Sequence, residues 1–132
     1  MPENKIKFKL PDEWLKQAEY DLETAEAMLE KGRYIYTVFM CHLSIEKALK
    51  GFYAKEFKKD PPKIHNLNYF YEKIDLNLTE NLQNFIDKLN SLSISARYPD
   101  ELEKLLKDYK EVVTKDILNQ TKELLQCLKQ ML

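Results

Sequence analysis

Residues 14–55 read WLKQAEYDLETAEAMLEKGRYIYTVFMCHLSIEKALKGFYAK, and this stretch decides the fold. In its first part, apolar residues recur at intervals of three and four, which is the spacing of one face of an α-helix. These residues are Leu15, Ala18, Leu22, Ala25 and Leu29. Gly32 follows them and is the residue type that most often ends a helix. We therefore predict a first helix that ends near Gly32 and begins near Pro11, with Asp12 as its N-cap.

The rest of the stretch predicts a second helix over residues 34–57, with apolar side chains on more than one side. One face consists of Ile35, Val38, His42, Ile45, Leu49 and Phe52. A second face consists of Tyr36, Phe39, Met40 and Leu43. A helix of this kind lies at the centre of a fold or at an interface. We expect the first face to pack inside the monomer and the second to form the surface of a homodimer.

Beyond residue 57 the chain breaks and then returns to helical spacing. Two prolines in KKDPPK (58–63) prevent the second helix from continuing. Three later polar residues are predicted to act as helix N-caps, namely Asn66, Thr79 and Thr114. Residues 100–113 fit either a short turn of helix or a packed loop.

No segment alternates like a β-strand between turn residues. The sequence therefore predicts an all-α fold, an up-and-down four-helix bundle with an additional short helix. In this prediction residues 1–11 form an N-terminal arm and residues 12–132 form the bundle. The length of 132 residues fits one domain.

The composition favours a cytoplasmic protein without a membrane anchor. No run approaches the ~20 apolar residues of a membrane helix, and the N-terminus lacks the apolar core of a signal peptide. Cys41 and Cys127 are the two cysteines, and neither has a partner at zinc-ligand spacing. We expect no metal and no cofactor. A net charge of −1 gives no general attraction to nucleic acid.

The charge is unevenly distributed along the chain. Residues 12–31 carry seven acids and two lysines, whereas residues 46–63 carry six lysines and three acids. One interpretation is two solvated helix faces, since surface charge is ordinary. The other is complementarity to a partner, or an anion site on the basic half.

Two histidines and their neighbours are candidates for chemistry. His42 lies on the apolar face of the second helix, where a satisfied core histidine is the ordinary case. Glu46 follows one turn later and can either orient His42 or pair with Lys50. Lys63 and His65 precede the next predicted helix, and a helix N-terminus beside such side chains can hold a phosphate. His65 can also cap that helix or pack locally.

Arg97 and Tyr98 stand where a long helix must end, because Pro99 disfavours helical backbone at the residue before it. A guanidinium group recognises phosphate through two parallel hydrogen bonds, and a neighbouring aromatic ring can stack on a base. Alternatively, Arg97 bonds the free carbonyl groups at the helix C-terminus.

Three pieces of the chain together resemble the HEPN domain family: residues 14–55, IHNL at 64–67 and ARYPD at 96–100. The resemblance covers about residues 12–131 and implies an all-α bundle that usually forms a homodimer. Many members are paired with a minimal nucleotidyltransferase as a toxin–antitoxin system, and others are proposed to bind nucleotides. One branch consists of metal-independent ribonucleases with an Arg-x4-6-His motif shared across the dimer.

This sequence departs from the ribonuclease motif. The positions that require His hold Leu102, Glu103 and Lys104 after Arg97, and Val38, Phe39 and Met40 after Arg33. These residues are poor proton shuttles near neutral pH, so the departure argues against an enzyme.

We therefore expect a non-catalytic, dimeric nucleotide-binding partner of a minimal nucleotidyltransferase. The candidate phosphate-binding residues are Arg97, Tyr98, His65, Lys63 and Lys50, and the polar candidates on the second helix are His42 and Glu46. Two alternatives stay open. One is a metal-independent endoribonuclease with a rearranged site, in which RNA is the ligand. The other is a protein-interaction scaffold.

Overall fold

The computed structural model describes residues 7–97 and 102–132. Within these residues the chain forms six α-helices and no strand. The helices are α1 (Pro11–Glu30), α2 (Tyr34–Phe57), α3 (Leu67–Lys73), α4 (Glu80–Arg97), α5 (Leu102–Asp108) and α6 (Glu111–Met131). The all-α prediction is confirmed. Of the two alternatives for residues 100–113, the described part contains a short helix, α5.

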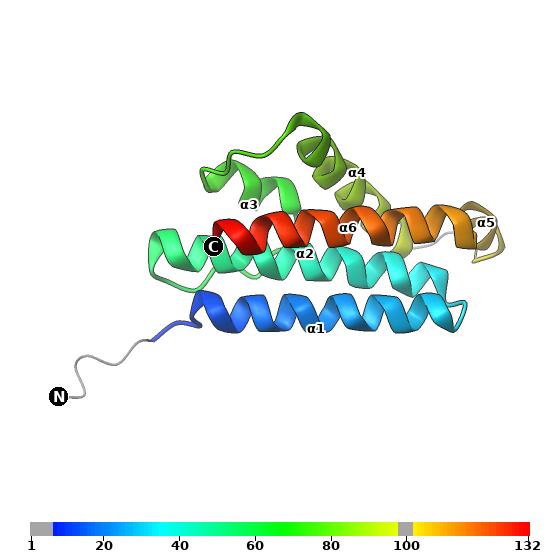
Figure 1. Cartoon of the computed structure of the whole chain (residues 1–132), viewed down its shortest axis with the longest axis horizontal. Coiled ribbons are helices and arrows are strands. Elements are labelled where there is room, and N and C mark those ends of the chain that lie inside the picture. The colour runs from blue at the N-terminus through cyan, green and yellow to red at the C-terminus, as the bar shows by residue number, and fades with distance from the viewer. Residues whose placement is uncertain (1–6, 98–101) are drawn as a thin grey trace.

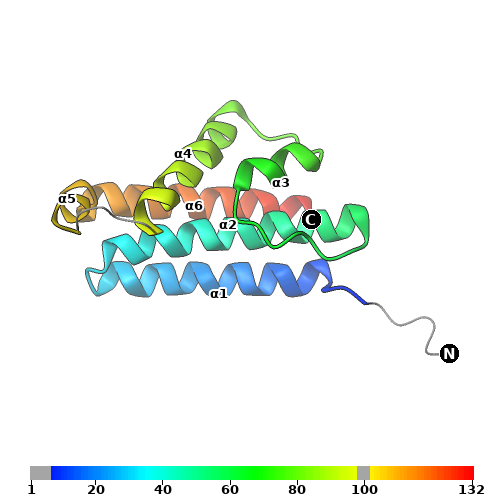
Figure 2. The same cartoon turned by 180° about the vertical axis from the view of Figure 1, so that it is seen from behind.

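The long helices alternate in direction, as an up-and-down bundle requires. Helices α1, α2 and α6 lie side by side in Figure 1, and α1 runs opposite to the other two. Helices α3 and α4 cover another side of α2, and α4 is inclined to it (Figures 1 and 2). Helix α2 contacts all five other helices and is therefore the centre of the fold.

The central position of α2 follows from its two apolar faces. Its observed bounds, Tyr34–Phe57, match the predicted helix. Val38, Ile45 and Leu49 are fully buried, so the first face packs inside the monomer as expected. On the second face Tyr36 remains exposed, whereas the other three members are partly buried.

A tight connection at Gly32 joins α1 to α2. Gly32 has a φ of 71°, which confirms it as the residue that closes α1. Its N–H donates to the Leu29 carbonyl at 3.0 Å, and the Arg33 N–H donates to the Met28 carbonyl at 2.8 Å. This pair of bonds is the Schellman motif, which satisfies carbonyl groups that the helix end would leave free.

Helices α1 and α2 also approach closely at the opposite end of the hairpin. A Cβ atom placed on Gly51 would lie 3.2 Å from the Cβ of Trp14 and 3.4 Å from the carbonyl oxygen of Pro11. Gly51 therefore allows the N-terminal end of α1 to pack directly against the backbone of α2.

Two predicted N-caps are confirmed and two are wrong. The Asn66 side chain caps α3, and the Thr79 hydroxyl accepts the Leu82 N–H at 3.3 Å. Helix α1 instead begins at Pro11, which suits a first helical position because its fixed φ is helical, so Asp12 already lies in the first turn. Helix α6 begins at Glu111, and Thr114 is buried inside it.

Part of the acidic run of residues 12–31 forms ion pairs within the chain. Lys47 Nζ lies 2.8 Å from the Asp21 carboxylate. From α6, Lys122 pairs with Glu26 at 2.9 Å and Lys129 pairs with Glu19 at 2.8 Å. Contacts of α1 with α2 and α6 thus account for three of the seven acids.

Across residues 7–97 and 102–132, no helix combines the length and the apolar character needed to cross a membrane.

Candidate functional site

The candidate site is built on a buried carboxylate in the middle of α2. Glu46 is 2% exposed, and the Nζ of Lys50 lies 2.9 Å from its Oε2. The two residues are one helical turn apart, so both side chains project from the same face of α2. Of the two partners considered for Glu46, Lys50 therefore forms the direct ion pair. Lys50 is itself buried and lies beside the Phe70 ring, 5.5 Å from its centroid.

His65 reaches the same carboxylate from the loop that precedes α3. Its Nδ1 lies 3.0 Å from both carboxylate oxygens of Glu46, across 19 positions of sequence. The His65 side chain is nevertheless 59% exposed. Because Nδ1 is the nitrogen that faces Glu46, it donates its proton there and Nε2 is directed away from the carboxylate.

His42 approaches Glu46 from the buried side. Its Nδ1 lies 3.8 Å from Glu46 Oε1, and its Nε2 lies 3.3 Å from Asn90 Oδ1. Asn90 Oδ1 also accepts the Leu67 N–H at 3.0 Å, which fixes this atom as the amide oxygen. Nε2 of His42 is therefore the protonated donor in this contact.

His42, Glu46, Lys50 and His65 together form what we term the Glu46 cluster. A buried carboxylate is tolerated when cations and hydrogen-bond donors surround it, because burial removes its water. With one carboxylate, one ammonium group and two imidazoles, the cluster gains positive charge whenever an imidazole takes up a proton. It can therefore attract an anion, or transfer a proton through the exposed ring of His65.

The first three N–H groups of α3 are already bonded and are not free to hold an anion. The Asn66 side chain accepts the N–H groups of Asn68 and Tyr69, and Asn90 accepts that of Leu67. Any anion held here must therefore contact side chains. Lys63 is exposed in the same loop, two residues before His65.

The candidates Arg97 and Tyr98 cannot be placed relative to the cluster by their side chains. Arg97 is the last residue of α4, but its side chain lies outside the described part of the structure, and Tyr98 lies outside the described residues altogether. In α4, Arg97 follows Asn90 by seven positions, which corresponds to roughly 10 Å along the helix axis. The structure thus brings together four of the seven candidates, namely His42, Glu46, Lys50 and His65.

Asn90 is the site residue that the sequence reasoning missed. It follows Ile86 by one helical turn and adjoins Leu89, both of which are buried. A polar residue on the otherwise apolar inward face of α4 was the available signal, because such groups need a partner when buried.

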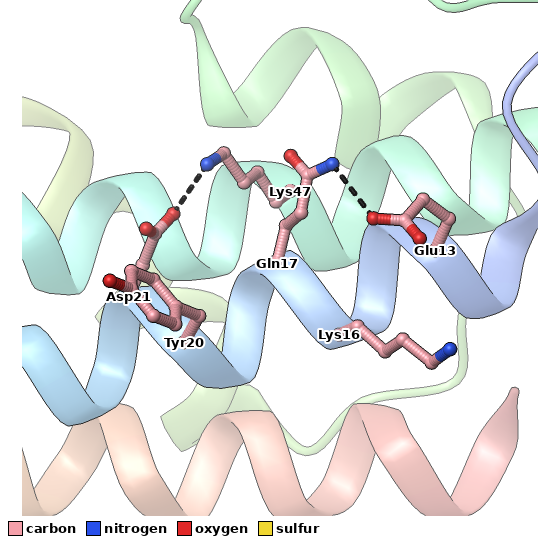
Figure 3. A pocket seen from close by; sticks show the side chains of 6 residues that line it. All are labelled: Glu13, Lys16, Gln17, Tyr20, Asp21 and Lys47. Carbon is pink, nitrogen blue, oxygen red and sulfur yellow. Dashed lines mark hydrogen bonds and ion pairs between the residues drawn. The ribbon is translucent and has the colours of Figure 1, made fainter.

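Two surface pockets are weaker candidates. One, of about 250 Å³, lies over α1 and α2 and is shown in Figure 3. Four of its six lining residues already pair with each other, Lys47 with Asp21 and Gln17 with Glu13. The other, of about 360 Å³, lies at the end of α2 beside Met131.

The described residues contain neither a metal-binding group of side chains nor, in Cys41, a reactive thiol. No group of three or more His, Cys, Asp or Glu side chains there is arranged to hold a metal ion. Burial raises the pKa of the Cys41 thiol to about 12. Cys41 therefore stays protonated at neutral pH and is a poor nucleophile.

These features place the protein in a structural class: it is an all-α bundle whose central helix carries a buried carboxylate that contacts both a lysine and a histidine. The chain belongs to the HEPN domain family, because the HEPN domain model matches residues 11–131.

The chain is also similar to several other proteins. The "Putative toxin MJ1304" of Methanocaldococcus jannaschii is 28% identical over 143 residues, covering 100% of this chain and 94% of the relative. The crystal structure of TT1696 from Thermus thermophilus matches with a TM-score of 0.80 at 23% identity, covering 92% of this chain and 98% of that one. ST0689, an archaeal HEPN homologue, matches with a TM-score of 0.73 at 22% identity, covering 94% and 98% of the two chains. Both solved structures share the fold.

Proposed function

We propose that this protein is a cytoplasmic, dimeric HEPN component of a toxin–antitoxin-type pair, which binds a nucleotide or RNA phosphate and works with a minimal nucleotidyltransferase. Family membership and the toxin relative support the type of system. The missing His of the Arg-x4-6-His motif supports a non-catalytic role. The observation that carries the phosphate site is the contact of exposed His65 with buried Glu46 at 3.0 Å.

Charge balance explains why this contact favours an anion. The ammonium group of Lys50 neutralises Glu46 at 2.9 Å, so protonation of His65 leaves the cluster with a net positive charge. Lys63 adds a further exposed cation in the same loop. A phosphate that approaches the exposed edge of His65 therefore meets a hydrogen-bond donor and two positive charges.

Thermal unfolding with AMP, ATP and short RNA tests the phosphate site. Ligand at a hundred times its dissociation constant adds about 2.7 kcal/mol, which is on the order of 10 °C for a domain of this size. We expect this shift in the wild type and a much smaller one in His65→Gln and Arg97→Ala. Lys88→Ala, an exposed change on α4, should respond like the wild type. If no ligand raises the unfolding temperature of the wild type, the phosphate-binding proposal is wrong and the scaffold alternative gains support.

Association with other chains needs its own test. We expect light scattering to give the mass of a homodimer, and Tyr36→Glu to weaken it, because Tyr36 is 61% exposed on the face assigned to the dimer. A cognate minimal nucleotidyltransferase should co-elute with the protein. A monomer at all concentrations, or separate elution of the two proteins, would remove the corresponding part of the proposal.

A metal-independent endoribonuclease is the second candidate, and one observation favours it. A carboxylate that holds Nδ1 of an exposed imidazole orients the other nitrogen for general acid–base catalysis, as His65 and Glu46 do here. Cleavage of RNA in the presence of EDTA, lost in His65→Gln and retained in Lys88→Ala, would support catalysis. Intact RNA after incubation with folded wild-type protein would exclude it.

A further inference from the structure

A closed circuit of contacts links the Glu46 cluster to α4. From Glu46 it passes to His42 at 3.8 Å and from His42 to Asn90 at 3.3 Å. Asn90 then accepts the Leu67 N–H at 3.0 Å, and the backbone leads through Asn66 back to His65. His65 closes the circuit on Glu46 at 3.0 Å.

Asn90 uses both ends of its amide in this circuit. Its Oδ1 faces the Leu67 N–H and the ring of His42, and its Nδ2 donates to Asn66 Oδ1 at 3.4 Å. Leu67 is fully buried, so the residue that Asn90 anchors is also fixed by packing. These two contacts hold the two positions that directly follow His65.

The loop before His65 has hydrogen bonds of its own, but these do not reach Glu46 or α4: the Lys9 N–H donates to Asp60 Oδ1 and the Ile64 N–H donates to the Pro62 carbonyl, both at 2.9 Å. Residues 58–66 contain no helix or strand, and Lys63 and His65 are both exposed. The orientation of the His65 ring therefore depends on Glu46 at one end and on the anchored residues Asn66 and Leu67 at the other.

We propose that Asn90 is a positioning residue: by anchoring Asn66 and Leu67 it makes His65 present Nδ1 to Glu46 and Nε2 to an incoming phosphate. The role of the phosphate rests on the function proposed above, whereas the orientation of the ring does not. Asn90 acts through His65 and is not itself a ligand contact.

This arrangement has a spectroscopic signature. The nitrogen that bears the proton in a neutral imidazole is set by the hydrogen bond that the ring makes. In this structure Glu46 accepts from Nδ1 of His65, so its neutral form carries the proton on Nδ1. A histidine released into water favours the proton on Nε2. The tautomer of His65 thus reports its orientation in the absence of any ligand.

The test is ¹⁵N NMR of the imidazole nitrogens at alkaline pH, where the rings are neutral. His42 and His65 are the two histidines of the chain, and His65→Gln assigns their signals. We expect the Nδ1–H form of His65 in the wild type and the Nε2–H form in Asn90→Leu. Asn84→Leu makes the same change at an exposed position of α4 and should leave the tautomer unchanged.

A conservative variant separates positioning from general damage to the fold. Asn90→Asp retains the acceptor for Leu67 and His42 but loses the donor to Asn66, so it should restore the Nδ1–H form only in part. If Asn90→Leu does not fold, Asn90→Ala removes the same polar groups without adding apolar bulk and decides the question. A folded Leu or Ala variant that retains the Nδ1–H form overturns the proposal.

Titration with inorganic phosphate, at a pH at which the His65 ring is protonated and Nε2 can donate, keeps the two proposals distinguishable. If phosphate perturbs the His65 signals of the wild type, we expect Asn90→Leu to weaken its binding about tenfold, comparable to the loss of one hydrogen bond. A phosphate affinity unchanged in Asn90→Leu overturns the positioning role in binding. If phosphate does not affect the wild type but the tautomer changes in Asn90→Leu, the phosphate site fails while the control of ring orientation by Asn90 stands.

Discussion

The two sides of α2 bury polar groups in different ways. Toward α1 and α6 the polar groups that α2 itself buries fully are neutral: the Ser44 hydroxyl donates to the Ala18 carbonyl at 2.7 Å, and the Cys41 thiol is buried. The α2 charge that pairs with α1, Lys47, stays 22% exposed at its ion pair with Asp21. Toward the loop before α3 and toward α4, the same helix buries the ionisable side chains of Glu46 and Lys50.

The charged side of α2 is the better candidate for function. Neutral groups that satisfy each other cost little to bury and link neighbouring helices, as Ser44 does. Buried charges often stabilise a fold no more than apolar residues of the same size would. The charged side of α2 is also the side at which one ring, that of His65, remains exposed. A costly arrangement that is open to solvent is therefore better explained by binding or catalysis than by stability.

The largest expected effect comes from breaking the ion pair on the charged side. Lys50→Met leaves Glu46 buried without its ammonium partner, and such a loss costs about 3 kcal/mol. Urea unfolding should show this decrease in the free energy of unfolding. Lys129→Met, whose ammonium group pairs with Glu19 while 50% exposed, is the matched control. A loss below about 1 kcal/mol in Lys50→Met would mean that the histidines compensate for the lysine.

On the neutral side of α2, the buried Cys41 thiol should make the free energy of unfolding depend on pH in the alkaline range. Burial raises the pKa of the Cys41 thiol from 9.0 to about 12, so the folded protein retains a proton that the unfolded chain loses. The free energy of unfolding therefore falls as pH rises from 9 toward 12, by about 2 kcal/mol at pH 10.5 relative to pH 8.

Comparison with Cys41→Ala isolates this thiol, because the variant lacks the titrating group. Burial also raises the pKa values of Tyr71 and Tyr109, but both proteins contain these tyrosines. Urea unfolding at pH 8 and pH 10.5 measures the difference. Equal pH dependence of the two proteins would show that the thiol does not contribute.

A smaller loss of stability is expected from removing the Asn66 cap of α3, the helix that follows the His65 loop. Asn66→Ala removes the acceptor of two backbone N–H groups and should cost about 1 kcal/mol. Thermal unfolding measures this loss. Asn68→Ala, a change of the same type within the first turn of α3, should cost less because no cap is removed. Equal losses of stability in the two variants would show that the hydrogen bonds of the cap do not stabilise α3.

The smallest effect is expected at the surface of the bundle. Lys122→Met breaks the ion pair with Glu26, in which both side chains are 44% exposed. Exposed pairs contribute about 0.5 kcal/mol or less, since water and salt screen them. Urea unfolding at low and at high salt should therefore give nearly the same value for this variant and the wild type. A loss comparable to that of Lys50→Met would contradict the distinction between buried and exposed pairs.

Local patterns predicted much of the fold. The bounds of α2, the end of α1 at Gly32 and the cap at Asn66 each depend on residues close together in sequence. The errors were also local: Pro11 displaced Asp12 from the capping position, and α6 begins one turn before Thr114.

The site was only partly predictable, because its contacts cross the chain. Helical spacing placed Glu46 near both Lys50 and His42, but could not choose between them. The contact of His65 with Glu46 depends on the path of an irregular loop, which no periodicity describes. The contact between His42 and Asn90 spans 48 positions and requires the packing of α4 on α2.

The short Gly32 connection has a consequence for the order of folding. Helices α1 and α2 are neighbours in sequence, and contacts between neighbouring segments form early because they close short loops. The contacts around Glu46 require α2, the irregular loop and α4 to meet, so they close longer loops and should form later. By the same reasoning, a partial opening of the native state should release the Glu46 side before it separates the α1–α2 hairpin.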